Sequence, residues 1–201
     1  MIIIVDYEMG NSRSIVNMLN RIGISSEITR DHAKINASQK IILPGVGSFD
    51  AAMKNLKKYN LIDILNQKVL SDRTPVLGIC LGMQLLTNSS EEGDIDGLGW
   101  IQGRSIKFNA SKNIKVPHMG WNLVTPKPTS KLCRGITSDS RFYFVHSYYV
   151  KVHDKVDSCM QTNYSLLFDS AIEKENIFGV QFHPEKSHKY GMQLLKNFSE
   201  I

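Results

Sequence analysis

Long apolar runs, paired cysteines and clusters of basic charge are all missing from this sequence. No apolar stretch approaches the roughly 20 residues of a membrane span. The apolar start, four residues after Met1, ends before Asp6 and is too short for a secretory signal. The three cysteines, Cys80, Cys133 and Cys159, form no CxxC pair and no zinc-finger spacing. We therefore expect a cytoplasmic chain outside membranes, in which a functional cysteine would act as a thiol.

The charge is mildly basic but dispersed. Lys and Arg number 24 against 19 Asp and Glu, a net charge of +5, and no three basic residues are consecutive. Nucleic-acid sites concentrate such charge on one face, so we expect no nucleic-acid partner. Hydrophobic residues make up 42% of the 201 residues, enough for a sizeable core. With no repeat, linker or metal motif, we expect one domain over residues 1–201 and no cofactor.

The apolar pattern predicts alternating strands and helices over the first half of the chain. Apolar, β-branched runs typical of buried parallel strands occupy residues 1–5, 25–29, 40–43, 75–79 and 177–182. Helical spacing occupies residues 14–22, 49–69 (one helix, or two broken near Asn60), 81–87 and 192–198. This alternation predicts a parallel α/β sheet. Turn-bounded runs predict an antiparallel extension at residues 97–108, 117–125 and 141–152.

Cys80 lies where the predicted strand at 75–79 meets a helix, between Gly78 and Gly82. The pattern G-x-C-x-G is the thiol form of the nucleophile elbow, in which small neighbours permit a strained turn that lifts a nucleophile above the sheet. A helix N-terminus also favours a thiolate. Cys80 is therefore predicted to be a nucleophile rather than an ordinary buried cysteine. Cys133 and Cys159 lack this context and are predicted to be structural.

A thiolate nucleophile needs a base, and the base needs an orienting group. Among the six histidines, His183 directly follows the last predicted parallel strand and precedes Glu185 by two residues. Because the carboxyl ends of parallel strands meet at one edge of a sheet, His183 is predicted to face Cys80, with Glu185 holding the imidazole. His118 and His146 lie in the antiparallel part and are expected to pack or bind.

The loop 44–48, PGVGS, follows another predicted strand, and its two glycines let the backbone approach a ligand closely. Acyl chemistry at a cysteine creates an oxyanion that needs backbone N–H donors. The N–H groups of this loop and of Leu81 are the candidates, and a plain turn is the alternative. No GK[ST] follows, which excludes a phosphate-binding loop. The residues alone thus predict a cysteine acyl-transfer enzyme of unspecified substrate.

Several segments, in the same order over nearly the whole chain, resemble the class I (triad) glutamine amidotransferases: PGVGSFDAAM, GICLGMQLL, VPHMGWN, FYFVHSYY and GVQFHPEKS. They resemble more narrowly the glutaminase subunits of bacterial imidazole glycerol phosphate synthase. The resemblance implies a flavodoxin-like, doubly wound, mostly parallel sheet with an antiparallel extension. It implies hydrolysis of glutamine to glutamate and ammonia. The implied partner is a (β/α)8-barrel cyclase of histidine biosynthesis, which forms a heterodimer with the subunit and receives the ammonia.

The same resemblance implies residue roles. Cys80, His183 and Glu185 match the nucleophile, base and orienting carboxylate, and Val46 lies in the loop that supplies an oxyanion donor beside that of Leu81. The positions that match the glutamine-binding pocket and its oxyanion loop are Gly45, Val46, Gly47, Gln84, Glu92, Tyr143, His146, Ser147 and Tyr148. The positions that match the partner interface are Asn11, Trp121 and Lys186.

Departures from the family pattern leave alternatives open. The first loop reads DYEMGNS where DYGMGNL is usual, so Glu8 replaces a glycine and Ser12 a leucine; Trp100 replaces a smaller aliphatic residue. If that glycine serves a positive φ, Glu8 is strained. The changes fall where partner contacts are expected, which keeps open a paralogue that feeds an N-acetyl sugar amidotransferase of surface-polysaccharide synthesis. A non-catalytic relative and another cysteine hydrolase are further alternatives, and the intact triad argues against the first of these.

Overall fold

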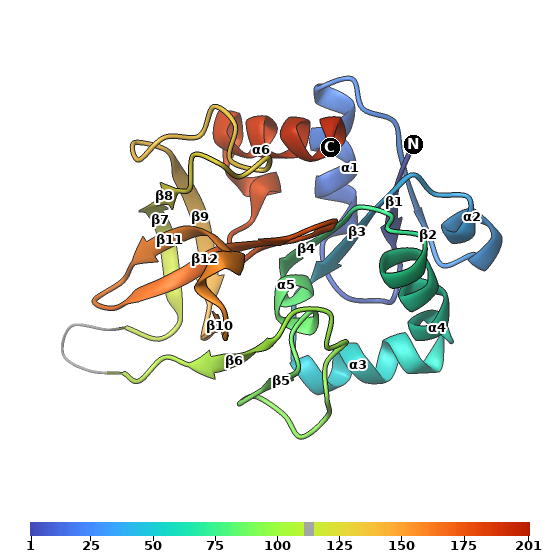
Figure 1. The fold of residues 1–201 in the computed structure, drawn as a ribbon, viewed down its shortest axis with the longest axis horizontal. Coiled ribbons are helices and arrows are strands. Elements are labelled where there is room, and N and C mark those ends of the chain that lie inside the picture. The colour runs from blue at the N-terminus through green and yellow to red at the C-terminus, as the bar shows by residue number, and fades with distance from the viewer. Residues whose placement is uncertain (111–114) are drawn as a thin grey trace.

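The computed structural model describes residues 1–110 and 115–201. Helices and strands alternate in its first half, and strands dominate the second (Figure 1). The helices are α1 (Ser12–Arg21), α2 (His32–Asn36), α3 (Phe49–Lys58), α4 (Leu61–Asn66), α5 (Leu81–Leu85) and α6 (His188–Glu200). The strands are β1 (Ile2–Val5), β2 (Ser26–Thr29), β3 (Lys40–Gly45), β4 (Val76–Cys80), β5 (Ser89–Ser90), β6 (Gly103–Lys107), β7 (His118–Leu123), β8 (Thr125–Pro126), β9 (Arg141–His146), β10 (Tyr148–Val152), β11 (Ser158–Asn163), β12 (Leu167–Lys174) and β13 (Ile177–Val180).

The largest sheet has eight strands in the order β2-β1-β3-β4-β13-β12-β11-β8. The strands from β2 to β13 run parallel, and those from β13 to β8 run antiparallel. Two smaller sheets, β10-β6-β5 and β7-β9, lie beside it. The predicted doubly wound, mostly parallel sheet with an antiparallel extension is therefore confirmed. Its parallel order places the carboxyl ends of β3, β4 and β13 next to one another.

The sheet is covered on both faces, as the continuous apolar strands predict. Along β1, Ile2 and Ile4 belong to one core cluster with residues of α1 and α6. The alternate residues Ile3 and Val5 belong to a second cluster with residues of α3 and α4. Figure 1 shows these helix pairs on opposite sides of the sheet. Successive strand side chains point to opposite faces, so one short strand stabilises both layers.

Helix boundaries follow local chemistry. α1 begins at Ser12, two residues before the predicted start, and the side chain of Asn11 caps it by accepting the N–H of Ser14 at 3.4 Å. Of the two alternatives for residues 49–69, the structure has two helices: Asn60, with φ 54°, separates α3 from α4. α6 starts four residues before the predicted 192. The strands β11 and β12 were not predicted.

Glycines allow α5 to pack directly against the strands that precede it. A Cβ atom on Gly82 would lie 1.8 Å from the Leu43 carbonyl oxygen of β3, and one on Gly78 would lie 2.6 Å from the Gly82 carbonyl oxygen. Neither contact can be relieved by a side-chain rotation, because both involve backbone atoms. The glycine pattern around Cys80 is thus required by the close approach of helix and sheet.

We expect Gly82→Ala to lower the free energy of unfolding by about 3 kcal/mol or more, because the backbone of β3 or α5 must move to admit the methyl group. Gly23→Ala is the matched control: no atom of the described residues lies within 4 Å of its Cβ position, so only the strain of φ +75° remains, about 1 kcal/mol. Urea denaturation of both variants measures the difference. Equal losses in the two variants would contradict the packing explanation.

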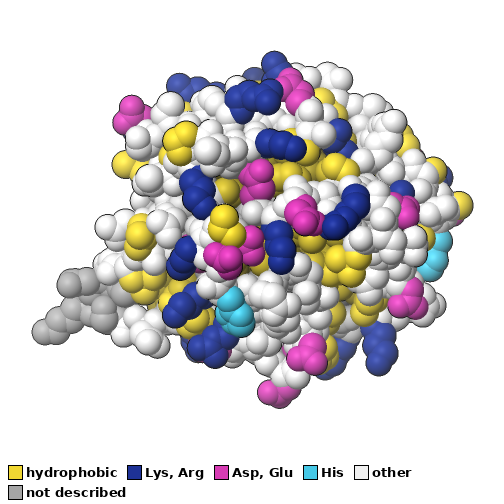
Figure 2. Space-filling model, in the orientation of Figure 1, with side chains coloured by type: hydrophobic (Ala, Val, Ile, Leu, Met, Phe, Trp, Pro, Cys, Tyr) yellow, Lys and Arg dark blue, Asp and Glu magenta, His cyan; other side chains and the backbone are white. Residues whose placement is uncertain are grey.

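The surface carries mixed charge. Figure 2 shows one face, on which Lys and Arg side chains alternate with Asp and Glu rather than forming a single basic stripe. Among the described residues, no helix has the length and apolar character that crossing a membrane requires.

Candidate active site

Cys80 ends β4 and immediately precedes α5 with φ 56° and ψ −109°. Positive φ is rare for a residue with a side chain, and such strain is concentrated at functional sites. Gly45, the last residue of β3, is its neighbour across the sheet. The thiol is nearly buried, with 6% of the residue exposed. The backbone therefore has the strained strand-to-helix turn that the sequence predicts for a nucleophile elbow.

His183 follows β13, the strand adjacent to β4, and is paired with Glu185. Its Nδ1 atom lies 2.7 Å from Glu185 Oε1, and both side chains are buried. Its Nε2 atom is also buried and makes no hydrogen bond within the described residues. Burial lowers the pKa of His183, but the interactions with Cys80 and Glu185 outweigh this effect and raise it to about 10. Thiol, imidazole and carboxylate thus lie in the order required for nucleophilic catalysis.

A cavity of about 350 Å³ opens onto the thiol. It has the size of a small-molecule site. Its lining residues are Val46, Gly47, Cys80, Leu81, Gln84, Glu92, Pro117, Val145, His146, Ser147 and Tyr148. Most of the residues predicted to bind substrate line this cavity, and the exceptions are Gly45 and Tyr143. Pro117 and Val145 were not named from the sequence, although both lie in the segments that carry the family resemblance.

Gly45 and Tyr143 do not line this cavity, and their part in substrate binding stays a prediction. A Cβ atom on Gly45 would lie 2.8 Å from the Gly82 nitrogen, so this glycine serves the packing of α5 on β3. The ring of Tyr143 lies 6.2 Å from the ring of Trp121 and 5.6 Å from Nζ of Lys186. Tyr143 therefore belongs with two of the residues predicted for the partner interface.

The three residues predicted for the partner interface lie on different elements and have different neighbours. Trp121, on β7, is 45% exposed and stacks on His188 with ring centroids 5.5 Å apart. Lys186 is exposed, beside Tyr143. Asn11 caps α1, and α1 contacts the short turn Pro184–Lys186. Trp121 and Lys186 thus both lie beside Tyr143, and Lys186 directly follows Glu185 in the sequence.

The loop that carries Val46 is held from two sides. A Cβ atom on Gly47, which has φ +114°, would lie 2.8 Å from the methyl carbon of Met9. On the other side, Glu92 Oε2 accepts the N–H of Phe49, the first residue of α3, at 2.9 Å. Tyr7 is buried and donates its hydroxyl to the carbonyl of Pro44. The loop that would supply an oxyanion donor is therefore packed against residues 6–11.

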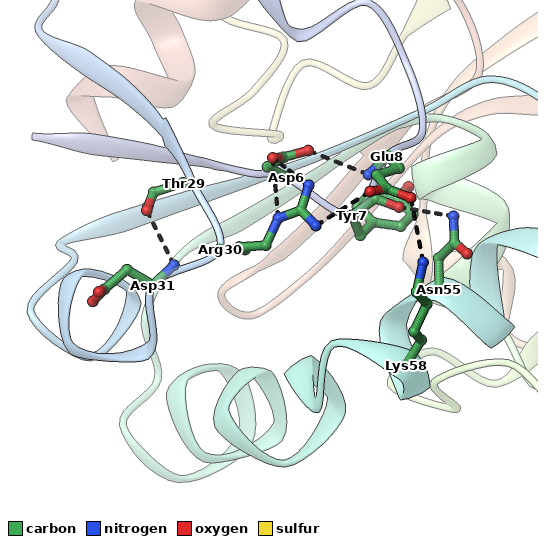
Figure 3. Close-up of polar contacts among 8 residues, drawn as sticks. All are labelled: Asp6, Tyr7, Glu8, Thr29, Arg30, Asp31, Asn55 and Lys58. Carbon is green, nitrogen blue, oxygen red and sulfur yellow. Dashed lines mark hydrogen bonds and ion pairs between the residues drawn. The ribbon is translucent and has the colours of Figure 1, made fainter.

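Residues 6–11 are in turn fixed by charges from neighbouring elements (Figure 3). Glu8 has φ 64°, so this position does have the positive φ that the family glycine suggests. Its carboxylate lies 3.4 Å from Arg30 and 3.7 Å from Lys58, and Arg30 lies 2.6 Å from Asp6. Both basic residues belong to this chain. The departure at Glu8 therefore combines a strained backbone with internal ion pairs.

Two substitutions at this position separate strain from charge. Glu8→Ala removes the ion pairs and keeps a Cβ atom at φ 64°, whereas Glu8→Gly removes both the ion pairs and the strain. Because an L-residue is disfavoured in the left-handed region, we expect Glu8→Ala to unfold about 2–4 °C below Glu8→Gly. Calorimetry measures this directly. A higher unfolding temperature for the alanine variant would show that φ strain is not what distinguishes them.

A cysteine with a strained backbone lies beside a buried His–Glu pair at the carboxyl edge of a doubly wound sheet. This is the arrangement of a cysteine-dependent acyl-transfer enzyme. The chain belongs to the class I glutamine amidotransferase family, whose family model matches residues 3–201.

Curated relatives agree with this membership, and a solved structure agrees with the fold. The chain is 57% identical over 198 residues to imidazole glycerol phosphate synthase subunit HisH 2 of Methanococcus maripaludis, with 98% of both chains covered. It is 49% identical to the protein of the same name from Pseudomonas aeruginosa, with 100% of both chains covered. The structure of PurLQS from Thermotoga maritima aligns with a TM-score of 0.76 at 17% identity, covering 99% of this chain and 97% of that one. This last likeness shows the fold alone.

Proposed function

We propose that the protein is the glutaminase subunit of an imidazole glycerol phosphate synthase, which hydrolyses glutamine to glutamate and ammonia. The observation that carries the proposal is the strained Cys80 elbow beside the buried His183–Glu185 pair, at a cavity of about 350 Å³. The full-length similarity to chains named HisH supports the pathway. We propose further that residues 1–201 act as one domain in the cytoplasm, with glutamine as substrate.

The geometry supports a thioester mechanism. The Cys80 thiolate attacks the side-chain amide carbon of glutamine, and the N–H groups of Val46 and Leu81 stabilise the oxyanion. The His183 imidazolium then protonates the departing nitrogen, and ammonia leaves. The same histidine takes a proton from water, the resulting hydroxide attacks the thioester, and glutamate is released. Gln84 and Glu92, on the cavity wall, are placed to hold the polar groups of the amino acid.

The exposed residues near the site support a proposal for where a partner binds. We propose that Asn11, Trp121 and Lys186 contact a (β/α)8-barrel synthase subunit that receives the ammonia in a heterodimer. Trp121 and Lys186 lie beside Tyr143, and the backbone carbonyl of Tyr143 accepts the N–H of His183 at 2.9 Å. A partner bound to this surface would therefore contact Tyr143, the residue whose backbone is hydrogen-bonded to His183. The comparisons favour this partner and give the sugar amidotransferase alternative no support.

A tagged pull-down from native extract, followed by glutamate-release assays, tests the proposal. We expect the imidazole-forming cyclase to co-purify, and glutamine hydrolysis to be slow in the isolated chain and faster in the complex. Recovery of a sugar amidotransferase instead would overturn the pathway while keeping the chemistry. Absence of glutaminase activity in the purified complex would overturn the chemistry itself.

A further inference from the structure

A hydrogen-bonded network of side chains and the backbone carbonyl of Tyr148 connects Cys80 to the partly exposed strand β7. Gln181 is fully buried directly after β13, and its Nε2 atom lies 3.7 Å from Cys80 Sγ. Gln84 Nε2 lies 3.2 Å from Gln181 Oε1 and 3.3 Å from the Tyr148 carbonyl oxygen. That carbonyl also lies 2.7 Å from His146 Nδ1. Two branches of the network therefore meet at one backbone carbonyl, which can only accept.

This carbonyl fixes the direction of the branch toward Cys80. Because the Tyr148 oxygen accepts, Gln84 must present its NH2 group there, and the same group reaches Gln181. Gln181 must then turn its oxygen toward Gln84 and its NH2 group toward the sulfur. Amide orientations are assigned from such networks, and here each assignment follows from the one before it.

The hydrogen bonds of the second branch also donate toward the Tyr148 carbonyl. His146 donates from Nδ1 to the carbonyl, so its Nε2 accepts from His118 Nδ1 at 2.9 Å. His118 Nε2 then accepts from Asn122 Nδ2 at 3.3 Å. Burial lowers the pKa of both histidines, to about 3 for His146 and about 4 for His118, so each is neutral and donates from one nitrogen. This branch holds the Tyr148 carbonyl in place from the side of β7.

We propose that Gln181 is a further catalytic residue, whose amide N–H donates to the Cys80 sulfur and stabilises the thiolate. This inference rests on the proposed function. Gln181 does not line the cavity. It therefore contacts the sulfur from the side away from the cavity and leaves the side that faces the cavity open to substrate. Among the described residues, His183 and Tyr7 also interact electrostatically with Cys80, and the Val145 carbonyl, 4.0 Å from the sulfur, accepts only from a protonated thiol. Gln181 favours the charged form, because a hydrogen bond to a charged group is stronger than one to a neutral group.

The test is the rate at which iodoacetamide alkylates Cys80 at pH 8, followed by mass spectrometry of the Cys80 peptide without substrate or partner. We expect Gln181→Leu to slow alkylation about 10- to 100-fold, the loss expected for a hydrogen bond to a charged group. In the complex, kcat for glutamine hydrolysis should fall similarly, with KM within about threefold. Gln193→Leu, on α6 and bonded to Asn197, is the control and should match the wild type.

A second variant keeps the test decisive if Gln181→Leu fails to fold. Gln181→Glu keeps the size and the acceptor toward Gln84 but sets a carboxylate against the sulfur, so we expect alkylation at least as slow as in Gln181→Leu. Alkylation within twofold of the wild type in either folded variant would overturn the inference. If alkylation is slow in the variants but the wild-type complex does not hydrolyse glutamine, the proposed function is overturned. The role of Gln181 in stabilising the thiolate would still hold.

Discussion

Replacing Cys80 with alanine is expected to lower glutamine hydrolysis by at least about 10⁴-fold, because no other group can form the thioester. The positive φ at this position is kept, and the buried methyl group fits where the cysteine Cβ was. The variant should therefore fold and still bind the synthase subunit. Glutamate release by the purified complex, measured at saturating glutamine, gives the ratio of kcat values.

The other cysteines provide the matched control. Cys133 is buried and its sulfur lies 3.3 Å from the Cys159 carbonyl oxygen, among residues that do not line the cavity. Cys133→Ala should keep glutaminase activity within about twofold and lose about 1 kcal/mol of stability. A glutamine-analogue electrophile such as diazo-oxo-norleucine should label the wild type and Cys133→Ala at Cys80. Hydrolysis by Cys80→Ala within tenfold of the wild type would remove Cys80 from its proposed role.

The parallel half of the sheet and the elbow could be predicted because their sequence signals are local. Strands buried on both faces read as continuous apolar runs, as in Ile2–Val5 and Val76–Cys80. Gly78 and Gly82 mark the approach of α5 to the sheet. Parallel strands of this kind end at the same edge of the sheet. The sequence alone therefore places His183 near Cys80.

The antiparallel half was harder to predict because its buried residues include many polar ones. In β11 and β12, Thr162 donates to Ser170 at 2.8 Å, and both are buried. Asp169 is buried on β12 and paired with Lys155 at 2.8 Å. Such residues satisfy one another only after the strands pair, so neither strand shows an apolar alternation in the sequence.

Residue roles within the site depended on side-chain direction. Tyr143 was predicted to belong to the pocket from its segment, whereas its neighbour Trp121, 6.2 Å away between ring centroids, could be found only from the pairing of β7 with β9. Gln181 was missed, although it stands two residues before His183. Its burial and its contact with Cys80 depend on the pairing of β13 with β4, which no local pattern encodes.

Glu185→Gln is expected to lower kcat by about 10³–10⁴-fold while leaving the cavity intact, since Glu185 does not line it. The carboxylate accepts the Nδ1 proton of His183 and so keeps Nε2 free to take the thiol proton. A glutamine can instead donate to Nδ1, which places the imidazole proton on Nε2 and blocks that transfer. Glu200→Gln, an exposed change near the end of α6, is the matched control and should leave kcat unchanged.

The same variant should change how stability depends on pH. The folded-state pKa of His183 is raised to about 10 by interactions with Cys80 and Glu185, which outweigh burial, against an ordinary value of 6.5. Since the folded state binds this proton more tightly, the stabilisation is complete below pH 6.5 and is lost as the pH rises through about 10. Removing the Glu185 charge lowers this pKa, so the stability advantage of the wild type over Glu185→Gln should shrink between pH 6 and pH 10, by on the order of 1–3 kcal/mol. Urea denaturation of both proteins across this range measures it, and an advantage that stays constant with pH would mean that Glu185 does not hold a proton on His183.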